Sequence, residues 1–462
     1  MTTGIKNTLI GSYAGTAITQ GSNNVAVGYG ALDANTTGQL NTAIGYNALT
    51  AQNADAYNTA VGANSMEATT SGAYNVAMGR LSLAALTTGD YNVAIGYSAL
   101  STETGDGKNV AIGFEALKDQ NAGADAYNVA VGFGAGENVS TGIQNTLVGG
   151  LAGDALTTGG SSIAIGYRAL TTEDAGSYNI AIGAYALENQ DAGDAYNVAI
   201  GYFAGRQVTT GVDNVVIGGL AGDALTTGAR NVAIGYAALS TEDGHGRTVA
   251  IGYRALVAQD AGAEVYNVAV GYNAGAEVTT GSSNTIIGGL AGDALTAGGG
   301  NVAVGTQALS AEDDHSYNTA VGARALEALN AGAHGYNVAV GYVAGTAMTT
   351  GINNTLIGSK AGDALTTGIG NVALGAWALS TEDAHGRNIA IGFDALALQD
   401  AGADAYNVAI GYSAGGVVTT GVENTIIGGL AGDALTDGED NVVVGYDALS
   451  AETSGDGNVV MG

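Results

Sequence analysis

One five-residue phrase of the form Asn-Val/Thr-Ala-Ile/Val-Gly returns 27 times along this 462-residue chain. The glycine that closes the phrase is present in every copy, and asparagine opens all copies but two, where Ser162 and Thr248 replace it. Successive copies lie about 17–19 residues apart, and the shortest step is the usual one. Such a short and regular period predicts a repeat architecture in which each unit packs mainly on its neighbours.

A second period groups the copies in fours. Blocks of about 70 residues, themselves a longer repeat, begin at Asn58, Asn128, Asn197, Asn267, Asn337 and Asn407. We therefore expect one repetitive domain over 1–462, with leading coils at 1–57 and four-coil blocks from 58 to 462. Natural solenoids normally end in atypical capping repeats, so ends that fall inside a repeat favour a fragment of a longer array.

The repeat length limits the fold to a β class. Two helices need a longer unit, and the 78 glycines of this chain would destabilise helices by about 1 kcal/mol at each position. The phrase instead places β-branched residues two apart, as in a short strand. We predict an all-β parallel β-solenoid, or β-roll, of about 27 stacked coils, each with a strand, a turn, a second strand and another turn. At about 4.8 Å per coil, such a stack would extend roughly 130 Å.

Each position in the coil, counted from the asparagine as position 1, has a physical interpretation. Position 4 is always aliphatic, so we expect it in the core, with position 3 on the opposite face. Position 3 is nearly always alanine, and a small apolar residue facing outward predicts a second surface against it, most simply another chain. Asparagine is expected to bond its own coil's backbone and stack on its counterparts, and the glycine of the preceding Thr-Thr-Gly to take positive φ. The representative structural residues are Asn24, Gly28, Asn197, Gly201, Asn267, Gly271, Asn407 and Gly411.

Two pairs of positions vary together, as close packing requires. Where position 3 is large, as at Leu147, the tyrosine common at position 6 shrinks, as at Gly150. Coils with leucine at position 9 usually carry a polar residue at position 12, whereas coils with glycine at position 9 carry an aliphatic residue there.

Charge and composition exclude several function classes. The 12 Lys and Arg face 42 Asp and Glu, giving a formal net charge of −30, which argues against nucleic acid or an anionic membrane as a partner. The absence of cysteine removes disulfides and thiolate chemistry. No apolar run is long enough to span a membrane, and the N-terminus does not have the pattern of a signal peptide.

Candidate chemistry is concentrated in acidic turns. Three of the four histidines recur beside carboxylates in one coil type, whereas His334 lies in another turn. The candidate ligands of Ca²⁺ or another divalent cation are Glu242, Asp243, His245, Glu382, Asp383 and His385, with Glu312, Asp313 and His315 in the same pattern. The alternative is a solvated acidic turn, because the equivalent segment Glu173-Asp174-Ala175-Gly176 has no histidine. Otherwise we expect no cofactor.

Other sites are less well supported. A catalytic triad needs a buried, oriented histidine, which turn histidines do not supply, so we expect no enzyme activity. The 23 tyrosines recur at fixed coil positions; they are packing residues, or, if exposed in rows, platforms on which sugars stack. Trp377 occurs once and is interpreted as a substituted coil position.

The phrase resembles the repeat of the YadA-like head of trimeric autotransporter adhesins over the whole chain. Its longer form, Asn-Thr-Ala-Ile-Gly-Tyr-Asn-Ala-Leu at Asn41, is similar to the repetitive shafts of phage tail fibres. The resemblance implies a left-handed β-roll and three chains packed side by side, although the coils here are longer than is typical of the adhesin heads.

We therefore expect a non-enzymatic structural fibre protein, the rigid shaft or head of a surface adhesin or phage tail fibre. Its partners would be copies of itself and a cell-surface glycan or protein receptor, and its location an extracellular appendage or virion fibre. The alternatives are a self-assembling extracellular filament or sheath subunit and, from another class, a solenoid enzyme that acts on polysaccharides.

Overall fold

The computed structural model describes residues 3–105 and 107–462 and is all-β. The chain divides into two compact units, Met1–Arg230 and Asn231–Gly462, and each is a parallel β-solenoid. Their described residues contain 27 three-residue strands, as the repeat count predicts. Among the described residues there is no helix that is long and apolar enough to cross a bilayer.

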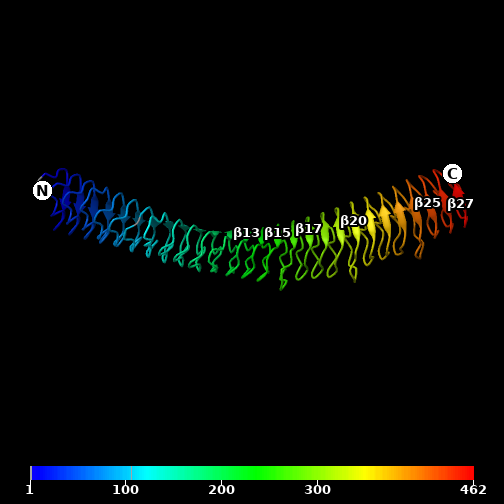
Figure 1. The fold of residues 1–462 in the computed structure, drawn as a ribbon, viewed down its shortest axis with the longest axis horizontal. Helices are drawn as coiled ribbons and strands as arrows, with labels where there is room; N and C mark the ends of the chain where they lie inside the picture. The colour runs from blue at the N-terminus through cyan, green and yellow to red at the C-terminus, as the bar shows by residue number, and fades with distance from the viewer. Residues whose placement is uncertain (1–2, 106) are drawn as a thin grey trace. The chain divides into compact units, whose positions relative to one another are not determined.

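Figure 1 shows the strands of each unit following one another in chain order. The first unit contains β1 (Thr8–Ile10), β2 (Val25–Val27), β3 (Thr42–Ile44), β4 (Thr59–Val61), β5 (Val76–Met78), β6 (Val93–Ile95), β7 (Val110–Ile112), β8 (Val129–Val131), β9 (Thr146–Val148), β10 (Ile163–Ile165), β11 (Ile180–Ile182), β12 (Val198–Ile200) and β13 (Val215–Ile217). The second unit contains β14 (Val232–Ile234), β15 (Val249–Ile251), β16 (Val268–Val270), β17 (Thr285–Ile287), β18 (Val302–Val304), β19 (Thr319–Val321), β20 (Val338–Val340), β21 (Thr355–Ile357), β22 (Val372–Leu374), β23 (Ile389–Ile391), β24 (Val408–Ile410), β25 (Thr425–Ile427), β26 (Val442–Val444) and β27 (Val459–Met461).

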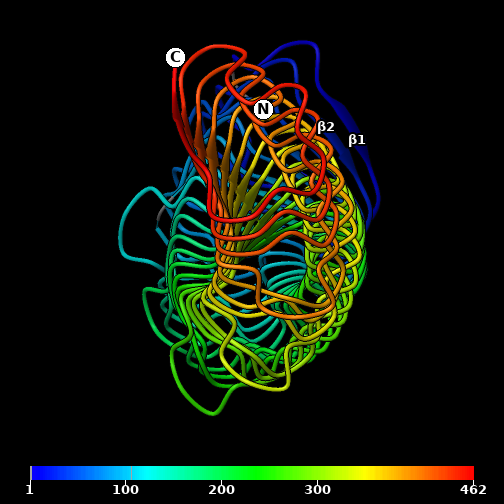
Figure 2. The ribbon, with the colours of Figure 1, turned by 90° about the vertical axis from the view of Figure 1, so that its right-hand side faces the viewer.

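Within each unit, consecutive strands pair in parallel and in one constant register. Val25 of β2 pairs with Thr42 of β3 across a coil of the usual length. Val249 of β15 pairs with Val268 of β16 in the same way, although that coil is longer. The added residues form a longer loop around Gly262, which has φ of 66° and open space on its outer side. Figure 2 shows such loops extending beyond the outline that the other coils share.

Each described coil has one strand, so the prediction of a second strand in every coil is wrong. Positions 7 and 9 take left-handed backbone conformations, with φ of 59° at Phe203 and 56° at Gly205, and a strand cannot continue through them. Successive coils are still hydrogen-bonded on this side: the Thr209 N–H donates to the Thr226 carbonyl at 2.8 Å. Turns therefore replace the second strand without leaving the backbone unpaired.

The strand faces are the reverse of the predicted ones. Position 3 lies inside the coil, as Ala233 does with no exposed surface, whereas Val232 and Ile234 on either side of it are partly exposed. The interior has room for one small strand residue because the buried Leu239 at position 9 and the buried residue at position 12 fill the rest. Alanine at position 3 thus reflects a narrow interior, and it is not evidence for a second chain.

Large residues at position 3 fill space left by glycine at position 9. Leu147 is fully buried, and a Cβ on Gly136 or Gly153 would lie 2.6 or 2.7 Å from its methyl groups. Two consecutive coils with glycine at position 9 therefore share one large strand residue. The tyrosine at position 6 points outward, as Tyr167 does, so it does not share this space with position 3.

The asparagines at position 1, which are buried except for Asn7 and Asn458 in the end coils, form a ladder from coil to coil. In Asn197, Nδ2 donates to the Gly211 carbonyl of its own coil at 2.7 Å, and Oδ1 accepts from the Asn214 N–H at 2.8 Å. The same two bonds are made by Asn24, Asn267 and Asn407. We call this row the asparagine ladder.

Glycines hold the coils at close approach. The closing glycines Gly28, Gly201, Gly271 and Gly411 have φ between 133° and 147°, and a Cβ on any of them would collide with the closing glycine of the next coil. The glycine of Thr-Thr-Gly was predicted to take positive φ, and it does not. A side chain on Gly211 would collide with the Gly228 carbonyl, while Asp213, two residues later, has φ of 59°.

Candidate functional site

Glutamates at position 12 lie inside the solenoid and recur once in each four-coil block. Five of them are fully buried, namely Glu103, Glu173, Glu242, Glu312 and Glu382, whereas Glu452 is partly exposed. These glutamates occur in coils with leucine at position 9. Coils with glycine at position 9 have an aliphatic residue at position 12 instead. In these coils the polar residue at position 12 is a buried carboxylate, and the prediction of a solvated turn is wrong for these side chains. In other coils with leucine at position 9 it is a buried glutamine, such as Gln259.

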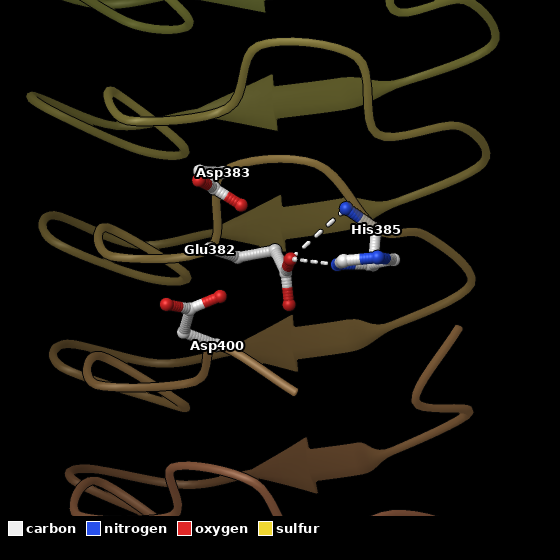
Figure 3. Close-up of side chains that lie close together, drawn as sticks. All are labelled: Glu382, Asp383, His385 and Asp400. Atoms are coloured by element: carbon white, nitrogen blue, oxygen red, sulfur yellow. Dashed lines mark hydrogen bonds and ion pairs between the residues drawn. The ribbon is translucent and has the colours of Figure 1, made fainter. Parts of the chain in front are cut away.

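A turn in the following residues holds each glutamate. Oε1 of Glu382 accepts a hydrogen bond of 3.0 Å from the backbone N–H of His385, and Glu242 and Glu312 accept the same bond from His245 and His315. The imidazole then folds back over the carboxylate. Nδ1 of His385 lies 3.5 Å from Oε1 of Glu382, as Figure 3 shows.

Two neighbouring coils contribute to the cluster at Glu382. Glu382, Asp383, His385 and Asp400 each place one potential ligand atom within 4.8 Å of the others. Asp383 and Asp400 occupy the same position in consecutive coils, those of β22 and β23, so the stacking of the coils brings them together. Figure 3 shows Glu382 between the two aspartates and the histidine.

Three related clusters have smaller or different donor sets. Glu242, Asp243 and His245 form one, and Glu312, Asp313 and His315 form another. The third, Glu173 with Asp174 and Asp191, contains carboxylates only. The six residues proposed from the sequence thus fall into two clusters, as their spacing predicts. Asp400 and Asp191 were missed, and their places one coil beyond Asp383 and Asp174 were the signal that could have found them.

Burial sets the electrostatics of these glutamates. It raises the pKa of Glu382, and the nearby charges of Asp400 and Asp383 act in the same direction, while hydrogen bonding to His385 opposes them. Burial likewise raises the pKa of Glu312, and it raises the pKa of Glu173 to about 7. The clusters therefore hold negative charge at an energetic cost that a cation would offset.

Outside the clusters, exposed aromatic rings form rows along the coils. Tyr57, Tyr74 and Tyr91 stack with ring centroids 5.0 and 5.2 Å apart and planes 4° and 2° apart. Each inner ring is covered on both faces by its neighbours. Because a sugar stacks on a ring face, such rows do not provide the platform considered from the sequence; they present ring edges and hydroxyl groups. His334 lies beside Tyr317, with ring centroids 5.2 Å apart, and is not a member of any of these acidic clusters.

Trp377 borders a surface groove in the second unit. The groove is lined by residues of several coils, among them Asp394, Leu398 and Asp433. The Lys360 ammonium lies 4.1 Å from the centroid of the Trp377 ring. The indole replaces the residue usual at position 7, as interpreted from the sequence, and one of its faces is covered by this cation.

No protein-family model matches this sequence, and the search of curated proteins likewise finds no match.

Proposed function

We propose that this chain is a non-enzymatic structural fibre protein, the rigid shaft or head of an extracellular appendage such as a surface adhesin or a phage tail fibre. The observation that carries the proposal is the constant parallel register of the strands, which is kept through shorter and longer coils alike. Each unit is thereby a continuous periodic body. The 13 strands of the first unit, at about 4.8 Å each, correspond to roughly 60 Å of stack.

The outward aliphatic residues of the strands supply a surface for lateral association. Ile44, Ile165 and Ile200 at position 4 are 39%, 36% and 36% exposed, and the residues at position 2 beside them are partly exposed as well. These residues recur on every strand of a unit and form a continuous apolar stripe. An interface of standard size buries about 800 Å² on each partner.

Copies of the same chain are the partners that best fit this stripe. A second solenoid has the same coil spacing, so its aliphatic residues stay in register along the whole contact. The resemblance to trimeric adhesin heads favours three chains side by side. This argument replaces the one based on position 3, whose alanines lie inside the coil.

Binding to a receptor would be weak at each contact and strong in sum. The repeated tyrosine edges and acidic turns present the same groups many times along a unit, and several such contacts raise the overall affinity through avidity. The receptor would be a cell-surface glycan or protein, and the net charge of −30 keeps the fibre in solution.

Solution mass tests the proposal. Light scattering of the full chain should give three times the mass of 45.1 kDa, and negative-stain images of the same sample should show rods. Replacing Ile44, Ile165 and Ile200 by Glu should release single chains, because carboxylates would face each other across the interface. The control is Ile143→Glu, an exposed aliphatic residue outside the strands, which should leave the mass unchanged. A single-chain mass for the unmodified protein would overturn the lateral assembly, and long polymers would favour the filament instead.

A further inference from the structure

In the cluster at Glu382, one glutamate oxygen lacks the hydrogen bond that its counterparts accept in the two other clusters that contain a histidine. Oε2 of Glu242 accepts a hydrogen bond of 3.1 Å from Gln259, and Oε2 of Glu312 accepts one of 3.4 Å from Asn318. Oε2 of Glu382 is buried and has no hydrogen-bond partner among the described residues. A buried carboxylate oxygen without a partner is costly, and an ion bound beside it is one way to satisfy it.

Two amides could satisfy this oxygen, and neither bonds to it. Asn388, the counterpart of Asn318, has a buried Nδ2 without a hydrogen-bond partner among the described residues, and the neighbouring glutamine is bonded elsewhere. Gln399 is the counterpart of Gln259 one coil beyond the glutamate, but its Nε2 donates to the Thr419 carbonyl at 3.0 Å. It therefore does not reach Glu382 as Gln259 reaches Glu242. Figure 3 shows the free oxygen of Glu382 on the side of the Asp400 carboxylate.

The charge of the cluster also calls for a cation. Three carboxylates lie together, and in the part of the chain that the structure describes none of them forms an ion pair with a lysine or arginine. The one basic group in the cluster is the His385 imidazole.

We propose that Glu382, Asp383, His385 and Asp400 bind one divalent cation of the Zn²⁺ class, which links two consecutive coils. One imidazole nitrogen and carboxylate oxygens form a donor set suited to zinc, which takes four ligands of this kind. Ca²⁺ prefers six to eight oxygen ligands and does not favour imidazole. Because Asp383 and Asp400 are exposed turn residues, their side chains can rotate to shorten the present separations to coordination distances.

The corresponding clusters in the other blocks are weaker candidates for a metal site. In the block that begins at Asn267, Asn330 stands where Asp400 stands here, which removes one carboxylate. The cluster at Glu173 also has a buried glutamate oxygen without a partner among the described residues, but it lacks the histidine. Occupancy of the Glu382 site does not depend on whether the chain forms a fibre.

Titration calorimetry of the full chain, stripped of metal with a chelator that is then removed, tests the site. Zn²⁺ should bind one site per chain at least 10-fold more tightly than Ca²⁺ or Mg²⁺ does. His385→Gly and Asp400→Asn should each weaken that binding at least 10-fold. Both replacements occur at the equivalent positions of sister coils, Gly176 and Asn330, so the coil should still form.

The matched control is His245→Gly, the same change in a coil whose glutamate oxygen is already bonded, and it should leave the Zn²⁺ affinity within 2-fold. X-ray absorption of the zinc complex should show one imidazole ligand, which His385→Gly removes. Equal losses from His245→Gly and His385→Gly would overturn the proposal in favour of diffuse binding to acidic turns. Failure of Zn²⁺ to bind more tightly than Mg²⁺ would overturn it as well, whatever the oligomeric state.

Discussion

Oδ1 of Asn284 accepts a hydrogen bond of 2.9 Å from the backbone N–H of Asn301, one coil further along the chain. The same side chain donates from Nδ2 to the Gly298 carbonyl of its own coil at 2.8 Å, so one amide closes its own coil and fastens the next. The asparagine ladder therefore explains why asparagine opens nearly every repeat: no other side chain of this length carries both an amide donor and a carbonyl acceptor.

Replacing Asn284 by Ala should destabilise its coil and the next one by about 2–4 kcal/mol. The change leaves two buried backbone groups, the Gly298 carbonyl and the Asn301 N–H, without partners. Hydrogen exchange of amides in the two coils measures the effect locally. Asn284→Ser should lose less, because Ser162 still accepts from the next asparagine, at 3.3 Å. Equal losses for both variants would contradict this account of the ladder.

Gly201→Ala should destabilise the protein by more than about 3 kcal/mol. Gly201 has φ of 140°, and a Cβ there would lie 2.6 Å from the Gly218 carbonyl oxygen, so strain and collision act together. Gly193→Ala separates backbone strain from collision, since Gly193 has φ of 74° but nothing near its Cβ position. Chemical denaturation of the control should show a loss of only about 1 kcal/mol. A similar loss in both variants would mean that coil contact is unimportant.

Leu147→Ala should destabilise the coils around it by about 2–5 kcal/mol, the usual range for a buried leucine. Leu147 occupies the space beside both Gly136 and Gly153, so its loss empties a cavity shared by two coils. Leu147→Val keeps most of that volume and matches Val216 at the equivalent position of the next block, and should lose about 1 kcal/mol. Thermal melting of the two variants gives the comparison. A mild effect of the alanine change would show that the coils collapse to fill the space.

Stability should fall as the pH rises from about 4.5 to about 7. Burial raises the pKa of Glu173 from 4.5 to about 7, so the folded state holds this proton more tightly than the unfolded chain does. The stabilisation is complete below the unfolded pKa and is lost as the pH passes the folded one, by about 3 kcal/mol for this buried group. Glu173→Gln introduces the residue type that Gln190 supplies at the same position of the next coil. It should reduce the difference between the melting temperatures at pH 5 and pH 8. An unchanged pH slope would exclude Glu173 as its source.

The repeat predicts the strand positions but not the strand faces. The closing glycine locates every strand from β1 to β27, and asparagine precedes all of them except β10 and β15, because both residues stand where coils touch. Alternation alone does not say which face is inside when positions 3 and 4 are both apolar. The narrow interior settles the choice in favour of alanine, and its width depends on residues at positions 9 and 12 that lie across the coil.

The candidate site was predictable only as far as its residues are neighbours in sequence. Glu382, Asp383 and His385 are evident as a cluster, whereas Asp400 joins them through the stacking of two coils. The burial of Glu382 was hidden because an acidic residue in a turn resembles a solvated one. Its leucine at position 9, Leu379, was the available signal that position 12 faces inward.

The longer loops permit the chain to vary in length without disturbing the stack. Residues are added between position 13 and the next asparagine, as around Gly332 and Gly402, while Thr319 still pairs with Val338. Within the second unit these loops recur every four coils, about 19 Å apart. Peptides inserted into these loops would therefore be displayed at fixed intervals along the unit.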